Sequence, residues 1–182
     1  MNETTFTFDL IDKYTPDIVI QTKIEQVEIA TKGYVKAIIN SYNGPISSYR
    51  TKKSSLTAAL DAFQIEEREV DIQEDLGEQD QKDYRYEVFL SVKGLEHYKY
   101  RMMFVNYGTI SYPVTIVMNE DLAIEYCGRR NTTFHIESMK KLEEMLDRIL
   151  QSKMMLSLIQ NLINEAIRKE NSISCKMDTE DN

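Results

Sequence analysis

Apolar residues recur at steps of three and four from Ser138 to Glu170, the spacing of one face of an α-helix. They are Leu142, Met145, Ile149, Leu156, Ile159, Ile163 and Ala166. Ser138 is placed to cap the first turn, and the helix is expected to end at Asn171 and Ser172. About 33 residues at roughly 1.5 Å each span on the order of 50 Å. We therefore expect part of this helix to protrude, to bend near residues 151–153, or to pack on another subunit.

The period of the pattern changes to two at Tyr84, which predicts strands. Apolar residues alternate in four segments: Tyr84 to Val92, Tyr98 to Phe104, Tyr112 to Met118 and Leu122 to Tyr126. The TTFHI segment (132–136) is a fifth candidate strand. Short connections between such strands are typical of an antiparallel meander with one buried face. The predicted class is α+β: a four- to five-stranded antiparallel meander packed against a long C-terminal helix, with N-terminal helices.

The N-terminal third is predicted to be mainly helical. Thr15, Pro16 and Asp17 form a helix start, since a hydroxyl at the cap, a proline and an acid suit the first turn. Apolar residues continue at helical spacing towards Tyr42, interrupted by Gly33, and a short helix is expected over residues 54–63. The opening residues 4–10 could form a strand or an arm over the core.

These elements suggest one compact unit with four parts. Residues 1–65 form a mainly helical N-terminal part, and residues 66–83 an acidic connection. Residues 84–170 form the sheet plus the long helix, and residues 171–182 a flexible tail. The acidic connection itself could be an edge strand, because Val70 and Ile72 alternate among its acids.

Composition indicates an ordinary globular protein. Of 182 residues, 42% are hydrophobic and 29% charged, and no apolar run approaches the roughly 20 residues that span a bilayer. The N-terminus lacks the features of a signal peptide, so a cytoplasmic location without membrane association is expected. Cys127 and Cys175 are predicted to be free thiols.

The net charge of −8 is unevenly distributed. Residues 66–83 hold nine acids against Arg68 and Lys82, a net −7, and residues 170–182 have a net −3, which leaves +2 for the remainder. The protein is therefore predicted to be bipolar rather than uniformly acidic.

The residue inventory favours a protein that is not an enzyme, with no catalytic residues, metal or cofactor. Cys127 and His135 could be imagined as nucleophile and base, but no orienting third group is identifiable. The acids near Asp71 and Glu74 have helical spacing, yet the pattern of a calcium loop is absent. Glycine-rich nucleotide motifs are absent as well.

Two charged features remain as candidate binding surfaces. The acidic one has a charge density that resembles a nucleic acid backbone and would attract a basic groove. Its candidate partner-binding residues are Glu66, Glu67, Glu69, Asp71, Glu74, Asp75, Glu78 and Asp80. The basic one would grip phosphate if its clusters converge, with Tyr49 or Tyr98 available to stack. Its candidate nucleic-acid-binding residues are Arg50, Lys52, Lys53, Arg129 and Arg130, together with Lys99 and Arg101. Scattered surface charge and an acidic loop that only aids solubility are the alternatives.

In size, acidity and lack of enzymatic motifs, the chain resembles the anti-CRISPR proteins that inhibit type II Cas9. The segments EEREVDIQEDLGEQD and CGRRN are where we expect this resemblance to matter. It implies a phage or mobile-element inhibitor that binds a Cas9–guide RNA complex and blocks DNA binding or cleavage. One alternative is a regulatory protein that binds DNA or RNA directly through the basic clusters. Another is an oligomeric phage or plasmid accessory protein, a homodimer through the long helix.

Overall fold

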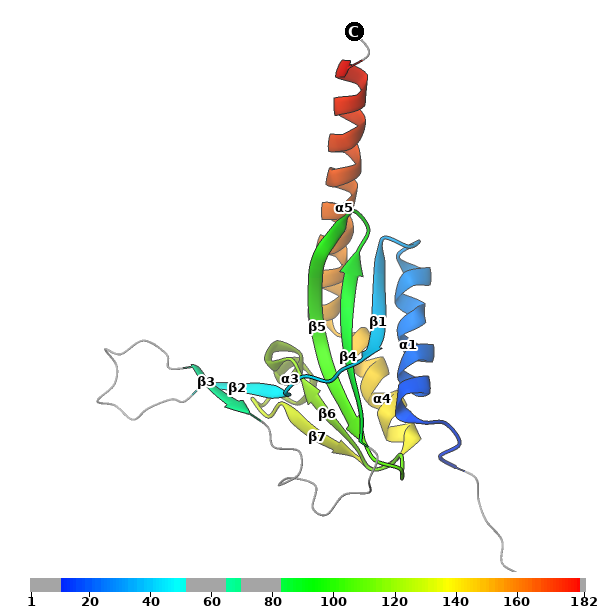
Figure 1. The fold of residues 1–182 in the computed structure, drawn as a ribbon, viewed down its shortest axis with the longest axis vertical. Coiled ribbons are helices and arrows are strands. Elements are labelled where there is room, and N and C mark those ends of the chain that lie inside the picture. The colour runs from blue at the N-terminus through cyan, green and yellow to red at the C-terminus, as the bar shows by residue number, and fades with distance from the viewer. Residues whose placement is uncertain (1–10, 52–64, 70–82, 181–182) are drawn as a thin grey trace, which may run out of the picture.

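The chain has an α+β fold in which helices cover one face of a five-stranded antiparallel sheet (Figure 1). The structure, a computed structural model, describes residues 11–51, 65–69 and 83–180, with 47–51, 65–69 and 173–180 described by their backbone. The elements are α1 (Pro16–Ala30), β1 (Val35–Ser41), β2 (Ser47–Thr51), β3 (Ile65–Glu69), β4 (Tyr84–Val92), β5 (Leu95–Tyr107), β6 (Val114–Met118), α3 (Glu120–Cys127), β7 (Thr133–Ile136), α4 (Met139–Leu150) and α5 (Lys153–Glu180). The strand order is β1-β4-β5-β6-β7, and β2 and β3 form a separate two-stranded sheet. Within the described residues, no helix combines the length and apolar character needed to cross a membrane.

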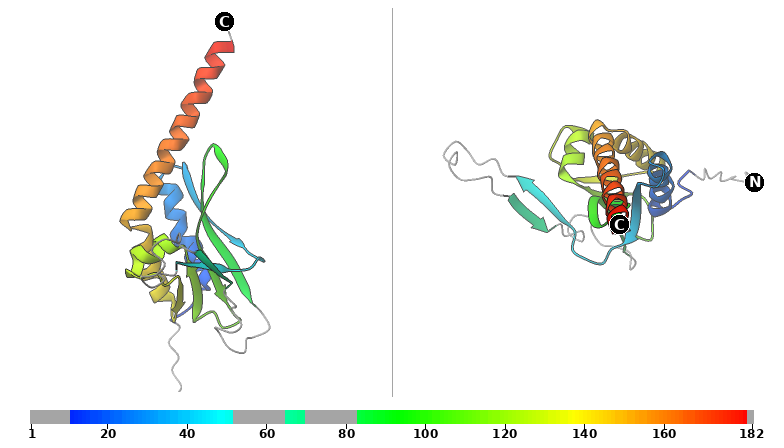
Figure 2. Two further views of the ribbon diagram at one scale, coloured as in Figure 1. Left: turned by 90° about the vertical axis from the view of Figure 1, so that its left-hand side faces the viewer. Right: turned by 90° about the horizontal axis from the view of Figure 1, so that it is seen from above.

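One face of the five-stranded sheet packs against α1, α4 and α5 (Figure 2). Successive side chains of a strand point to opposite faces, so Val88, Leu90 and Val92 of β4 all lie on this helix-covered face. The apolar stripe predicted for α4 meets them and is buried at Leu142 and Ile149. The predicted meander and its long C-terminal partner are confirmed.

The side chains of β5 switch between the two faces of the sheet part-way along the strand. Met102 and Met103 are both buried in the main core, and the pairing of β4 with β5 is irregular between Val88 and Phe89. A bulge of this kind inserts a residue and reverses the alternation beyond it. Phe104, predicted to share a face with Met102, therefore lies on the opposite face; that prediction was wrong.

The predicted N-terminal helix begins as expected but ends early. Its continuation to Tyr42 was wrong, because α1 ends at Ala30 and residues 35–41 form β1, an edge strand paired with β4. Lys32 and Gly33 have φ of 53° and 81°, a left-handed conformation that stops a helix. The segment after the turn is rich in β-branched residues, which favour a strand.

The predicted fourth strand, Leu122 to Tyr126, is instead the helix α3. The Asn119 side chain caps it by accepting from the Asp121 N–H at 3.0 Å, and Gly128 ends it with φ of 69°. Leu122 and Ala123 are buried against the core, so α3 belongs to the helix layer. The alternation at Leu122, Ile124 and Tyr126 was too short to distinguish a strand from one face of a helix.

The predicted C-terminal helix is two helices that meet at Gln151 and Ser152. Ser138 caps α4 as expected, and the Ser152 hydroxyl accepts from the Met155 N–H at 3.2 Å in the first turn of α5. Helix α5 then runs to Glu180 and rises beyond the end of the sheet (Figure 1). The predicted end at Asn171 was therefore wrong. The predicted opening segment (4–10) and short helix (54–63) lie outside the described residues.

The side chain of Thr31 joins the end of α1 to the start of β1, and replacing it tests this connection. Its buried hydroxyl lies 2.8 Å from the carbonyl oxygens of Val27 and Val35 and accepts from the Val35 N–H. Thr31→Val keeps the shape but removes these bonds, so we expect the free energy of unfolding to fall by about 1–3 kcal/mol in urea denaturation. Thr22→Val is the control, because the Thr22 hydroxyl bonds the Ile18 carbonyl on the exposed side of α1. Equal losses in the two variants would contradict this role for Thr31.

Candidate functional site

The sheet face opposite the helices, called here the open face, carries polar and aromatic side chains. The register places Asn40, Glu87 and Phe104 side by side on β1, β4 and β5, followed by Val117 of β6. Phe104 and Val117 form a small second core with Ile46. The open face therefore mixes apolar with polar and charged side chains, unlike the helix-covered face.

An ion cluster centred on Glu87 occupies the middle of the open face. Arg101 donates from Nε at 3.0 Å and Nη2 at 2.9 Å to Oε2, and Lys99 donates to Oε1. Burial tends to raise the pKa of Glu87, whose side chain is only 9% exposed, but the hydrogen bonds and charges of Lys99 and Arg101 outweigh it. The pKa is consequently held below its ordinary value and the carboxylate stays ionised.

Aromatic rings support the two cations of this cluster. Lys99 Nζ lies 4.0 Å from the centroid of the Phe89 ring, and Arg101 Cζ lies 4.9 Å from that of Phe104. Cations over ring faces are stabilised by the ring quadrupole. Lys99 and Arg101 are therefore held in place by Glu87 and by the rings, while their outer atoms remain exposed.

A polar row crosses the sheet beside this cluster. The register aligns Arg85, Asn106, Thr115 and His135 on four consecutive strands. His135 Nδ1 lies 3.2 Å from the Thr115 hydroxyl. Asn106 is 2% exposed and its Oδ1 has no hydrogen-bond partner, which is a cost to stability.

The segment after β1 crosses the open face and leads to the two-stranded sheet (Figure 1). Ile46 is buried on Phe104 and Val117, and the Tyr42 ring lies 4.8 Å from that of Phe104. A Cβ atom at Gly44 would lie 2.5 Å from the Tyr42 hydroxyl oxygen, so a larger residue there would displace the Tyr42 ring. The base of the two-stranded sheet is thus anchored to the core.

The two-stranded sheet holds part of the predicted acidic surface. Glu66, Glu67 and Glu69 occupy three of the five positions of β3. Its register sets Glu66 opposite Arg50 of β2, which brings one predicted basic residue into the acidic segment. Seven further predicted residues of these two surfaces lie outside the described residues: Lys52, Lys53, Asp71, Glu74, Asp75, Glu78 and Asp80.

The basic pairs of the sequence lie on different sides of the sheet. Arg129 and Arg130 follow α3 in the helix layer, whereas Lys99 and Arg101 lie on the open face. Arg130 Nε is 3.8 Å from a Glu120 carboxylate oxygen, and Arg129 is exposed. In the part of the chain that is described, these pairs do not merge into one phosphate-binding patch.

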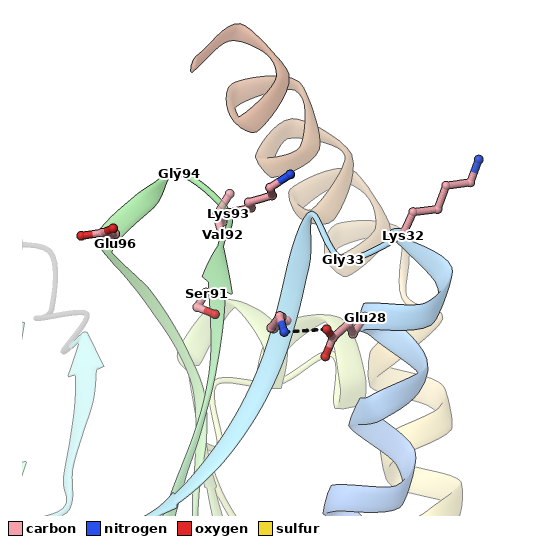
Figure 3. A pocket seen from close by; sticks show the side chains of 9 residues that line it. Glu28, Lys32, Gly33, Ser91, Val92, Lys93, Gly94 and Glu96 are labelled. Atoms are coloured by element: carbon pink, nitrogen blue, oxygen red, sulfur yellow. Dashed lines mark ion pairs between the residues drawn. The ribbon is translucent and has the colours of Figure 1, made fainter. Parts of the chain in front are cut away.

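A shallow pocket of about 530 Å³ lies at the far end of the sheet, between the α1–β1 turn and the β4–β5 hairpin (Figure 3). Lys36 pairs with Glu28 at 2.6 Å, while Lys32 and Glu96 point away from one another. Lys93 pairs with Glu170 of α5 at 2.8 Å. The charged groups of the pocket are directed outward or neutralised, so they do not converge on a ligand.

Cys127 and His135, considered above as nucleophile and base, each contact other residues. The Cys127 thiol donates to the Ala123 carbonyl at 3.2 Å, and His135 faces Thr115 on the open face. Among the described residues, no three His, Cys, Asp or Glu side chains are grouped as metal ligands. In the described ranges, Cys127 and His135 are therefore not paired with each other.

Comparison with known proteins adds no relative: no family model, curated protein or solved structure matches this chain.

Sequence reasoning missed Glu87 and Asn106 because single polar residues inside alternating strands look like ordinary solvent-facing positions. The signal for Glu87 was its place between apolar neighbours, together with Lys99 and Arg101 on the adjoining strand. Simple hairpin pairing from Val92 and Leu95 would set Glu87 opposite Tyr100, whereas the irregular register sets it opposite Phe104.

Glu87→Gln tests the ion cluster through pH. Because the folded-state pKa of Glu87 is lowered, its stabilisation is present above the unfolded value near 4.5 and is lost as pH falls through the folded value. We expect the variant to be less stable than the parent by about 1–3 kcal/mol near neutral pH, with the gap narrowing as the pH falls below 4.5. The measurement is urea unfolding at a series of pH values from neutral to strongly acid.

The control for this pH experiment is Glu144→Gln, since Glu144 is exposed and lies 4.0 Å from Lys140. An exposed pair of this kind should contribute little at any pH. A Glu87→Gln deficit that stays the same from neutral to acid pH would contradict the ionised cluster.

Proposed function

We propose that this protein is a non-catalytic binding protein that docks on a basic, nucleic-acid-binding surface of another protein, of the type that a Cas9–guide RNA complex presents, and blocks DNA binding or cleavage. The observation that carries the proposal is the two-stranded sheet, separate from the core sheet, in which Glu66, Glu67 and Glu69 crowd one short strand. The chain continues from this strand into the rest of the acidic segment, with its net −7 over residues 66–83.

Anchoring at the base of the two-stranded sheet supports docking. Ile46 and Tyr42 pack on Phe104 immediately before β2 begins, so the strands leave the body from a defined point. A segment held at its base loses less conformational freedom on binding than a free tail does. Dense negative charge would then draw it towards a basic groove that ordinarily accepts phosphates.

The pairing of most predicted basic residues with carboxylates favours a protein partner over direct binding to nucleic acid. Lys99 and Arg101 both bind Glu87, and Arg130 is near Glu120. Arg50 is opposite Glu66 in the register. A cation already paired with a carboxylate gains less from a phosphate, because the existing pair must be broken first. Among the described residues, no carboxylate pairs with Arg129, so its replacement is part of the test.

The test is a binding titration of the full chain against a Cas9–guide RNA complex at low and high salt. Replacing Glu66, Glu67 and Glu69 by Gln should weaken binding at least about tenfold at low salt and less at high salt, because screening already reduces the attraction. The matched control replaces Glu25, Glu125 and Glu144 by Gln, which changes the net charge equally at exposed helical positions.

Two results would overturn the proposal. Equal weakening by both triple variants would mean that net charge alone matters, and absence of binding to the complex would remove this partner. Bare duplex DNA is titrated in parallel: tight, steeply salt-dependent binding that Arg129→Gln with Arg130→Gln abolishes would transfer the function to direct nucleic-acid binding.

A further inference from the structure

One flank of α5, beside its buried face, is lined by apolar side chains, whereas its most exposed side carries polar residues such as Gln160 and Asn164. From Met154 to Asn164 the helix contains no charged residue. Leu156 is 56% exposed and Ile167 is 38% exposed, and Ile159 and Ile163 between them are half-buried, packing partly against the main core. Steps of three, four and four residues align these side chains in a single stripe along the helix. This α5 stripe (Leu156, Ile159, Ile163, Ile167) runs beside the buried line of Met155, Leu162 and Ala166.

We propose that a second copy of this chain packs along the α5 stripe. A two-fold dimer places the same surface of each copy in contact. A charged residue near the axis would therefore lie close to the same charge of the other copy, unless an opposite charge paired with it. The chain has a net charge of −8, yet the centre of the stripe carries none, and two copies meet there without repulsion. An apolar patch depleted of charge is also the usual composition of an interface centre.

The proposed contact surface runs along α5. Its 28 residues span about 42 Å, and its last turns rise clear of the sheet (Figure 1). Stable interfaces bury about 800 Å² on each partner. The four side chains of the stripe cannot supply this area alone, so the proposed contact also includes the neutral neighbours Ser157, Gln160 and Asn164. This surface is distinct from the acidic segment, and the inference does not depend on the proposed function.

Sedimentation equilibrium of the full chain over a range of concentrations tests the dimer. We expect the parent protein to have the mass of two copies, and Leu156→Glu combined with Ile167→Glu to raise the dissociation constant on the order of 100-fold. The matched control is Ile29→Glu, the same change at an isoleucine that is 77% exposed on α1. This control should remain dimeric.

A cross-linking measurement decides the matter if the double variant loses its helical circular dichroism. Gln160→Cys lies near the middle of the stripe, so in a chain with Cys127→Ser and Cys175→Ser it should form a disulfide between copies on mild oxidation. Glu25→Cys on the exposed side of α1 should not. A parent protein that stays monomeric at all concentrations, or dissociation of the dimer by Ile29→Glu to the same degree, would overturn the inference.

Discussion

The pairing of β4 with β5 determines what each face of the sheet presents. β5 is four residues longer than β4, and the excess is taken up by two irregularities in their register. One of them lets consecutive methionines, Met102 and Met103, both enter the main core. The same shift turns Phe104 to the open face, where it packs with Ile46 and supports Arg101. The second core, the ion cluster and the anchor of the two-stranded sheet all depend on this register.

The interruption between α4 and α5 determines how the helix layer packs on the sheet. Because the sheet is twisted, a single straight helix from Met139 to Glu180 would lie along it for only a few turns and then diverge from it. The interruption at Gln151 and Ser152 lets α4 pack beside α1, where Lys23 and Asp147 pair at 2.8 Å, and lets α5 take a different direction. The salt bridge from Lys93 to Glu170 then ties α5 to the β4–β5 hairpin. Beyond this contact the helix leaves the sheet.

Periodicity predicted the elements whose patterns were long and failed where they were short. The alternation in β4 and the helical stripe of α4 each extend over nine or more residues, and both were predicted correctly. At Leu122 to Tyr126 three apolar residues fit either period, and only the cap at Asn119 and Gly128 favoured a helix. A left-handed turn between Ala30 and Val35 separates helix α1 from strand β1. Apolar residues occur on both sides of this turn, so the helical spacing in the sequence continued past the end of the helix. Glu87 and Asn106 could not be placed because strand register depends on bulges that a sequence pattern does not locate.

The two proposed surfaces differ in charge in a way that suits different partners. A surface as acidic as residues 66–83 repels its own copy, so it is selective for a basic partner. The uncharged centre of the α5 stripe has no such selectivity for an opposite charge and suits a symmetric contact. The acidic strand β3 leaves the molecule from the open face, while α5 belongs to the layer behind the sheet (Figure 2). Because the sheet lies between them, a dimer through α5 would leave both copies of β3 accessible, and two linked acidic strands would bind a repeated or extended basic surface more tightly than one.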